Sequence, residues 1–222
     1  MQGETLNSFF QKVYLWMFAG LLISAVASYL ILLSPEIFNY IILTPIFWVL
    51  IIGELGIVIL LSMLLKKISA TTAKVLFILY SFLTGLTLSV VFLAYTLESI
   101  FMVFFIVAIM FLLLSLYGYF TKRDLSALGP ILFIGLIGII IAAVVNIFLK
   151  SSQFSMIISI LGVIIFTGLI IYDTQAIKRF FALEEKNKEA LSKLAIFGAL
   201  KLYLDFINLF LMLLRLLGKR RR

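Results

Sequence analysis

Seven runs of about 20 apolar residues, separated by short polar breaks, constrain this chain more than any other feature of its sequence. A helix rises 1.5 Å per residue and needs about 20 residues to cross about 30 Å of hydrocarbon, so each run is long enough to span a bilayer. The approximate spans are 13–33, 46–65, 75–97, 99–120, 129–149, 155–177 and 194–217. The sequence therefore predicts an all-α integral membrane protein with about seven transmembrane helices.

The composition agrees with this fold class. Of the 222 residues, 64% are hydrophobic and 13% are charged, whereas a soluble protein is about half apolar and about a quarter charged. No polar stretch is long enough for a separate soluble domain. We expect one polytopic membrane domain over residues 1–222.

Several kinds of chemistry are excluded by missing residue types. The chain has no cysteine and no histidine, which removes disulfides, thiol nucleophiles, iron–sulfur clusters and the usual zinc sites. We expect no cofactor and no enzymatic activity. The net charge of +8 does not indicate a nucleic-acid partner, because the basic residues lie in short loops between apolar runs.

Lysine and arginine are distributed unequally between the loops, and this predicts the orientation. The loops after the second, fourth and sixth runs carry Lys66, Lys67, Lys74, Lys122, Arg123, Lys178, Arg179, Lys186, Lys188 and Lys193. The opposite loops hold only Lys150. Cytoplasmic loops carry the excess of basic residues, so these loops and the N-terminus are predicted to be cytoplasmic.

The basic tail at residues 219–222 conflicts with this rule. A seventh full crossing places it on the outer side, where basic residues are disfavoured. Either the last run re-enters the membrane, or the tail is tolerated because six earlier helices have fixed the topology. We favour a full crossing.

Two runs carry small or polar residues at steps of four, which places them on one helix face. The residues are Ser81, Gly85 and Ser89 in the third run and Gly138, Ala142 and Asn146 in the fifth. Small residues let helices approach closely in lipid. Both stripes are interpreted as packing surfaces rather than binding sites.

Four ionisable residues lie within apolar runs, where each is costly unless it is paired or hydrated. They are Glu54, Asp173, Lys201 and Asp205. Such residues are functional by default, and a purely structural ion pair is the alternative interpretation.

Helix geometry groups the two aspartates. Asp173 lies about 9 Å inside the boundary marked by Arg179, and Asp205 lies about 6 Å deeper than Lys201 if that lysine reaches the same interface. Two carboxylates close together in a low dielectric do not both ionise easily and can share a proton. The pair is a candidate proton switch, or a site for calcium, which prefers oxygen ligands.

Two motifs make the chain recognisable. Residues 168–175 read GLIIYDTQ and residues 202–210 read LYLDFINLF; residues 10–14 (FQKVY) and 84–87 (TGLT) agree with them. Over essentially its whole length the chain resembles the Bax inhibitor-1 family, also called the transmembrane Bax inhibitor motif family, in its prokaryotic form. The resemblance implies seven helices, with the last one central and surrounded by the other six. It also implies a calcium leak controlled by protonation of two aspartates, at the positions of Asp173 and Asp205.

Two departures from the family pattern concern this gate. Characterised relatives have an arginine that bridges to the aspartates and holds the closed state, and the position expected for it here is Leu65, followed by Lys66 and Lys67. A lysine lacks the bidentate fork of arginine. In addition, Lys201 precedes Asp205 by one helical turn, and pairing would keep that carboxylate ionised.

The resulting prediction is a pH-sensitive, calcium-permeable leak channel, or a calcium/proton exchanger, that works as a monomer in the lipid bilayer. Asp173 and Asp205 form the proton and ion gate and are the tentative calcium ligands. Glu54, Lys66 and Lys201 are candidates for the ion path or the latch. The alternative is a non-transporting regulator that binds a membrane protease or a cell-death or stress partner. An intramembrane aspartyl protease is disfavoured, because the second aspartate lacks the Gly-x-Gly-Asp motif of that class.

Overall fold

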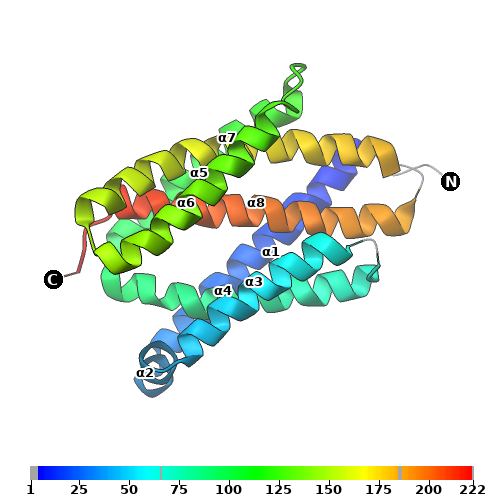
Figure 1. The fold of residues 1–222 in the computed structure, drawn as a ribbon. Coiled ribbons are helices and arrows are strands. Elements are labelled where there is room, and N and C mark those ends of the chain that lie inside the picture. The colour runs from blue at the N-terminus through cyan, green and yellow to red at the C-terminus, as the bar shows by residue number, and fades with distance from the viewer. Residues whose placement is uncertain (1–4, 66, 185–186, 222) are drawn as a thin grey trace. The chain divides into compact units, whose positions relative to one another are not determined.

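The computed structural model describes residues 5–65, 67–184 and 187–221 (Figure 1). These residues form helices α1 (Leu6–Leu32), α2 (Pro35–Leu43), α3 (Ile46–Leu64), α4 (Ala70–Ala94), α5 (Leu97–Phe120), α6 (Leu128–Leu149), α7 (Ser152–Glu184) and α8 (Lys188–Leu217). Within the described residues, seven of them, all except α2, are long and apolar enough to cross a membrane. The predicted fold class, an all-α protein with seven membrane-spanning helices, is confirmed.

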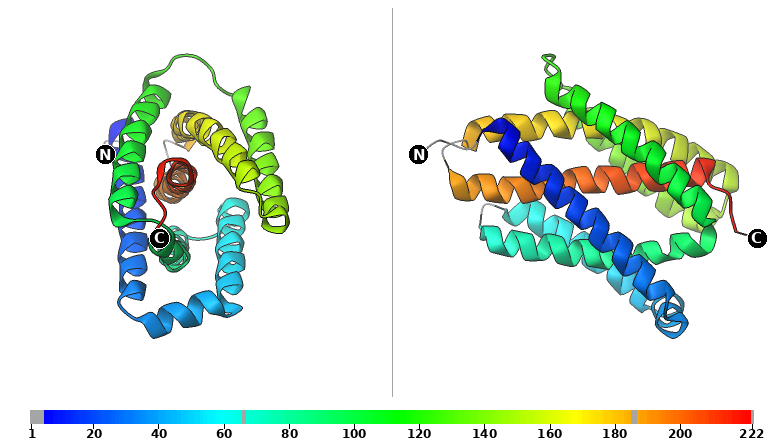
Figure 2. Two further views of the ribbon diagram at one scale, coloured as in Figure 1. Left: turned by 90° about the vertical axis from the view of Figure 1, so that its left-hand side faces the viewer. Right: turned by 180° about the vertical axis from the view of Figure 1, so that it is seen from behind.

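The short helix α2 was missed by the sequence analysis. It has nine residues and begins with a proline at its first turn, where the missing N–H costs nothing. At 1.5 Å per residue it is about 13 Å long, too short to cross a bilayer. It runs from the end of α1 to the start of α3 (Figure 2).

Several helices extend beyond the apolar runs that predicted them. Helix α1 begins at Leu6 rather than residue 13, because Thr5 caps it by accepting a hydrogen bond from the backbone N–H of Ser8. Helix α7 continues to Glu184, and α8 begins at Lys188. Hydropathy marks only the part of a helix that suits lipid, so the polar turns beyond it were not counted.

The contacts divide the chain into two compact units. The first comprises Met1–Ala94 and Phe180–Tyr203, and the second comprises Tyr95–Arg179 and Leu204–Arg222. Helices α7 and α8 each contribute residues to both units. The expectation of a single membrane domain over the whole chain stays a prediction.

In the first unit, small residues hold α1 against α4. The Ser28 hydroxyl donates to the Gly85 carbonyl at 2.5 Å, and the Ser24 hydroxyl donates to the Ser81 carbonyl at 2.6 Å. A Cβ on Gly85 would lie 2.6 Å from Cβ of Ala27. The stripe predicted in the third run is therefore a packing surface, as expected for helices that approach closely in lipid.

In the second unit, aromatic rings join α5 to the last part of α8. The ring of Phe104 lies 5.5 Å from that of Phe206 and 6.4 Å from that of Phe210. The stripe predicted in the fifth run makes no close contact at Gly138, where a Cβ would meet nothing within 4 Å. Asn146 caps the end of α6 by accepting from the backbone N–H of Ser151 at 3.2 Å, so its amide is used locally.

The C-terminal tail is attached to the start of α5. The backbone N–H of Thr96 donates to the Lys219 carbonyl at 3.0 Å, and the Lys219 N–H donates to the Ser99 hydroxyl at 2.9 Å. At the other end of α5, the Tyr119 carbonyl accepts a hydrogen bond from Lys178 of α7 at 2.8 Å. Among the described residues, α8 is long and apolar enough to cross a membrane, which agrees with the full crossing favoured by the sequence analysis.

Burial differs sharply between the helices. In the most apolar window of α8, 67% of the residues are buried, against 6% in those of α3 and α6. The mean hydropathy of that window is also lowest for α8, at 1.7, and reaches 2.9 for α6. A helix that tolerates polar residues is a helix shielded from lipid, which suits the presence of Asp205 on α8.

Candidate functional site

Both aspartates of the predicted gate lie in the second unit. Asp173 on α7 is 5% exposed, and Asp205 on α8 is 4% exposed. Carboxyl groups are almost never buried this deeply without a structural or functional reason. We refer to these two residues as the aspartate pair.

The residue after Asp173 fixes α7 against α5. The hydroxyls of Thr174 and Ser115 lie 3.1 Å apart, and Thr174 also donates to the Ile170 carbonyl at 2.7 Å. The two helices approach so closely here that a Cβ on Gly118 would lie 2.5 Å from the Ile171 carbonyl oxygen. The backbone that carries Asp173 is thereby held against α5.

The residue before Asp173 fixes α7 against α6. A Cβ on Gly129 would lie 2.5 Å from the phenol carbon and oxygen of Tyr172, so the tyrosine ring lies directly over the glycine. Successive residues of a helix are about 100° apart. Asp173 therefore lies on the arc of α7 between the Tyr172 contact with α6 and the Thr174 contact with α5.

Gln175 binds the α5–α6 loop to α7. Its side-chain Nε2 donates to the Arg123 carbonyl at 2.7 Å, and its Oε1 accepts from the backbone N–H of Leu125 at 2.9 Å. Lys178 adds a bond from its amine to the Tyr119 carbonyl at 2.8 Å. This loop and the end of α7 form one hydrogen-bonded assembly, two residues beyond Asp173.

An ion pair completes this assembly. The Arg179 guanidinium lies 3.1 Å from the Asp124 carboxylate and also bonds the Ser126 hydroxyl. The pKa of Asp124 is lowered, first because the Ser126 hydroxyl donates to it at 2.6 Å, then because the Ser126 N–H donates at 2.9 Å and Arg179 is nearby. The carboxylate is fully exposed, so the pair organises the loop more than it stabilises the fold.

The roles of Gln175 and Asp124 were missed by the sequence analysis. Gln175 was quoted only as part of a motif, and Asp124 was not singled out. Gln175 directly follows an aspartate and a threonine at the end of an apolar run. Because a buried amide needs hydrogen-bond partners, this position could have been predicted to bond another segment. The partners themselves, about 50 residues earlier in the chain, are not visible from that position.

Asp205 is followed by a ring that anchors α8. Phe206 packs on Phe104 at 5.5 Å and on Phe111 at 5.7 Å, both from α5. Asn208, one turn further, bonds the Leu204 carbonyl of its own helix at 2.8 Å. The aspartate therefore emerges from a part of α8 that is held against α5 by aromatic contacts.

Glu54 belongs to the first unit, whereas the aspartate pair belongs to the second. It is half-buried, and its two carboxyl oxygens lie 2.9 Å from the Thr87 hydroxyl and 3.3 Å from the Thr84 hydroxyl, both on α4. Two hydroxyls of α4 thus face this carboxyl group.

The candidate latch residues are only partly described. Lys66 lies outside the described residues. Leu65, the position expected for the family's arginine, follows the end of α3, and Lys67 is exposed. Lys201 is half-buried in the first unit, with its amine 6.0 Å from the centre of the Phe197 ring.

A bound metal ion needs several ligand side chains gathered in one place. Among the described residues, no group of three or more aspartate, glutamate, histidine or cysteine side chains is arranged to hold a metal. Calcium commonly takes 6–8 oxygen ligands.

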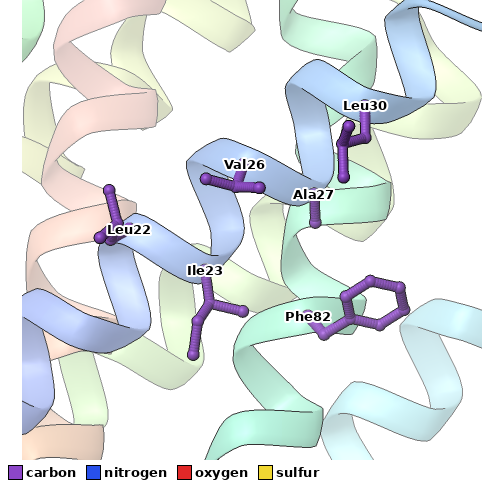
Figure 3. Close-up of a pocket in the computed structure, with 6 residues that line it drawn as sticks. All are labelled: Leu22, Ile23, Val26, Ala27, Leu30 and Phe82. Atoms are coloured by element: carbon purple, nitrogen blue, oxygen red, sulfur yellow. The ribbon is translucent and has the colours of Figure 1, made fainter.

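One open groove lies between α1 and α4 in the first unit (Figure 3). It is lined by Leu22, Ile23, Val26, Ala27, Leu30 and Phe82. These side chains are all hydrocarbon, so the groove offers no ligand to a cation and has the chemistry of a surface that faces lipid chains.

Comparisons with known proteins agree with the motifs. A family model described as "Inhibitor of apoptosis-promoting Bax1" matches residues 6–222. The chain is 46% identical over 218 residues to the inner membrane protein YbhL of Escherichia coli K12, covering 97% of this chain and 93% of the relative. It is 48% identical over 216 residues to a protein of Borreliella burgdorferi, with the same coverage, and 43% identical over 218 residues to protein RP147 of Rickettsia prowazekii. The chain therefore belongs to the Bax inhibitor-1 family of multi-pass membrane proteins.

Proposed function

We propose that this protein is a pH-sensitive calcium-permeable leak in the inner membrane of a prokaryotic cell, and that the aspartate pair is its gate. Exchange of calcium for protons is the variant of this proposal that the same residues would serve. The observation that carries the proposal is the burial of both carboxyl groups in one unit, on two membrane-spanning helices. A buried carboxyl group changes its charge at high cost, so its protonation selects between helix packings.

The contacts on either side of Asp173 support a gate. The Tyr172 and Thr174 contacts hold the backbone of α7 in place. Because this backbone is held, a change of charge at Asp173 would move nearby side chains and α8 instead of shifting α7 as a whole. In the proposal, Glu54 lines the ion path and Lys201, four residues before Asp205, favours the ionised form of that aspartate.

The proposed orientation places the N-terminus and the loop at residues 121–127 in the cytoplasm. It rests on the positive-inside rule. The assembly of Gln175, Lys178 and Arg179 with this loop would then lie on the cytoplasmic side of Asp173. The tail attached to Thr96 would lie on the outer side.

The decisive experiment measures calcium flux into liposomes that contain the purified protein, across a series of pH values. We expect flux above that of empty liposomes, with a pH dependence that is flattened in Asp173→Asn and Asp205→Asn. Asp124→Asn is the matched control, because it removes an exposed carboxylate of the same unit. Flux equal to that of empty liposomes at every pH would refute the leak. An unchanged pH profile in both variants would leave the leak but remove the aspartate gate.

A second candidate function is a non-transporting regulator, favoured by the description of the matching family as an inhibitor of another protein. In this proposal the protein binds a membrane protease or a stress-related partner, and the aspartates are structural. Crosslinking in native membranes followed by purification should then recover a stoichiometric partner. Recovery of this chain alone would count against it.

A further inference from the structure

The carboxyl group of Glu54 sits near the middle of a membrane-spanning helix. It follows the first residue of α3 by eight positions and precedes the last by ten, or about 12 Å and about 15 Å along the helix axis. An ionised carboxylate at this depth is expensive unless a cation or water compensates it. The groups that meet Glu54 therefore decide which protonation state this helix carries.

The groups that meet Glu54 on α4 are hydroxyls. Thr84 and Thr87 are three residues apart, so both project from one face of α4 toward α3. Among the described residues, no lysine or arginine forms an ion pair with Glu54. Hydroxyls serve both forms of a carboxyl group, because they donate to an anion and accept from an acid.

The other titratable groups near Glu54 are tyrosines and a glutamate. Tyr80 on α4 and Tyr203 on α8 interact with Glu54 and with the Thr84 hydroxyl. Helix α2, which packs on α3, carries Glu36 and Tyr40, and both of these side chains are exposed. None of these groups supplies a positive charge.

The Thr87 hydroxyl lies within hydrogen-bond distance of two oxygen atoms but has only one proton to donate. Its Oγ1 lies 2.9 Å from Oε1 of Glu54 and 3.0 Å from the carbonyl oxygen of Thr84. One hydroxyl proton cannot be donated fully to both oxygens. If Glu54 is protonated, its O–H donates to Thr87 and Thr87 donates to the Thr84 carbonyl, so every short contact contains one proton. If Glu54 is ionised, Thr87 donates to the carboxylate and its bond to the Thr84 carbonyl is lost.

We propose that Glu54 is a proton-binding site of the first unit, in which the acid form is held by Thr87 and Thr84 and joins α3 to α4. Glu54, Thr84 and Thr87 belong to the first unit, whereas the aspartate pair belongs to the second. Proton loss breaks the bond from Thr87 to the Thr84 carbonyl and leaves a charge that, among the described residues, faces the hydroxyls of Thr84 and Thr87. The contact between α3 and α4 is therefore sensitive to pH.

A chain of hydroxyls continues from this site to α1. Thr84 interacts with the Tyr203 hydroxyl, and the Tyr203 oxygen lies 2.7 Å from the Ser24 oxygen. Each of these groups can donate one hydrogen bond and accept another. Hydroxyl groups of α4, α8 and α1 therefore lie near one another inside the first unit.

The test is pH-difference infrared spectroscopy of the purified full-length protein in lipid bilayers, which reports the C=O stretch of protonated carboxyl groups. We expect a carboxylic-acid band that disappears in Glu54→Gln, shifts in Thr87→Val, and returns to its original position in Thr87→Ser, which restores the hydroxyl. Glu98→Gln is the matched control, because Glu98 is an exposed glutamate in the first turn of α5; its substitution should leave the band unchanged. Glutamine keeps the size and hydrogen bonding of Glu54, and elution as a single species by size exclusion confirms folding.

The outcome does not depend on calcium passage. If liposomes show no calcium flux but the Glu54 band is present, the leak fails and the proton site stands. Asp173→Asn and Asp205→Asn should leave the Glu54 band in place. A difference spectrum between wild type and Glu54→Gln that contains only carboxylate bands at every pH would overturn the inference, and so would a band that is indifferent to Thr87→Val.

Discussion

The contact of Gly118 with α7 gives the sharpest prediction for stability. In Gly118→Ala the new methyl group would lie 2.5 Å from the Ile171 carbonyl oxygen and 3.0 Å from Cβ of Thr174. The first of these is a backbone atom, so no side-chain rotation relieves the clash and the two helices must separate. Overpacking of this kind costs about 1–3 kcal/mol.

Gly138→Ala is the matched control. It adds the same methyl group to a membrane-spanning helix of the same unit, where a Cβ would meet nothing within 4 Å. Both substitutions gain the same helix propensity, about 1 kcal/mol relative to glycine. The difference between the two variants therefore isolates the clash at Gly118.

Thermal unfolding in detergent or nanodiscs measures this difference. For a protein of about 150–250 residues, 1 kcal/mol shifts the unfolding midpoint by about 2–4 °C, so Gly118→Ala should unfold about 2–12 °C below Gly138→Ala. Equal midpoints would refute the close packing of α5 on α7. If the gate proposal is correct, Gly118→Ala should also alter the pH profile of calcium flux, because the displaced segment of α7 carries Asp173.

Three further predictions concern the hydrogen bonds. Tyr203→Phe removes the hydroxyl that bonds Ser24 and should lower the free energy of unfolding by about 1 kcal/mol, measured by chemical denaturation. Gln175→Leu removes the acceptor of the Leu125 N–H, so hydrogen exchange at that amide should become faster. The pKa of Asp124 is lowered in the folded protein. Its ionised carboxylate therefore stabilises the folded loop above the unfolded pKa of about 3.9, and this stabilisation is lost as the pH falls through the lower folded value. Proteolysis of the loop should therefore accelerate only at strongly acidic pH.

Hydropathy predicted the membrane-spanning helices well, because the bilayer imposes a length and a polarity on each helix separately. It did not predict α2, whose nine residues are too few to produce a transmembrane signal. It also placed the starts of α1 and α8 too late, since Thr5 and the polar turn at Lys188 continue the helices beyond the apolar runs. These differences arise from local capping, to which hydropathy is insensitive.

The candidate site was predicted as a set of residues and not as an arrangement. Asp173 and Asp205 stood out because a charge in an apolar run is rare, and their burial agrees with that reasoning. The roles of Gln175 and Asp124 stayed hidden. Each depends on a partner from another segment, and a polar residue at a helix end has many plausible partners.

The sequence by itself determined the fold class, the seven spans, the absence of cysteine and histidine chemistry, and the acidic residues that lie at membrane depth. Only the tertiary structure decided what those residues meet. Glu54 bonds Thr87, 33 residues later, and Gln175 bonds the loop at Arg123, 52 residues earlier. Hydropathy is a property of single segments in lipid, whereas a hydrogen bond between helices depends on their rotation and register, which packing alone sets.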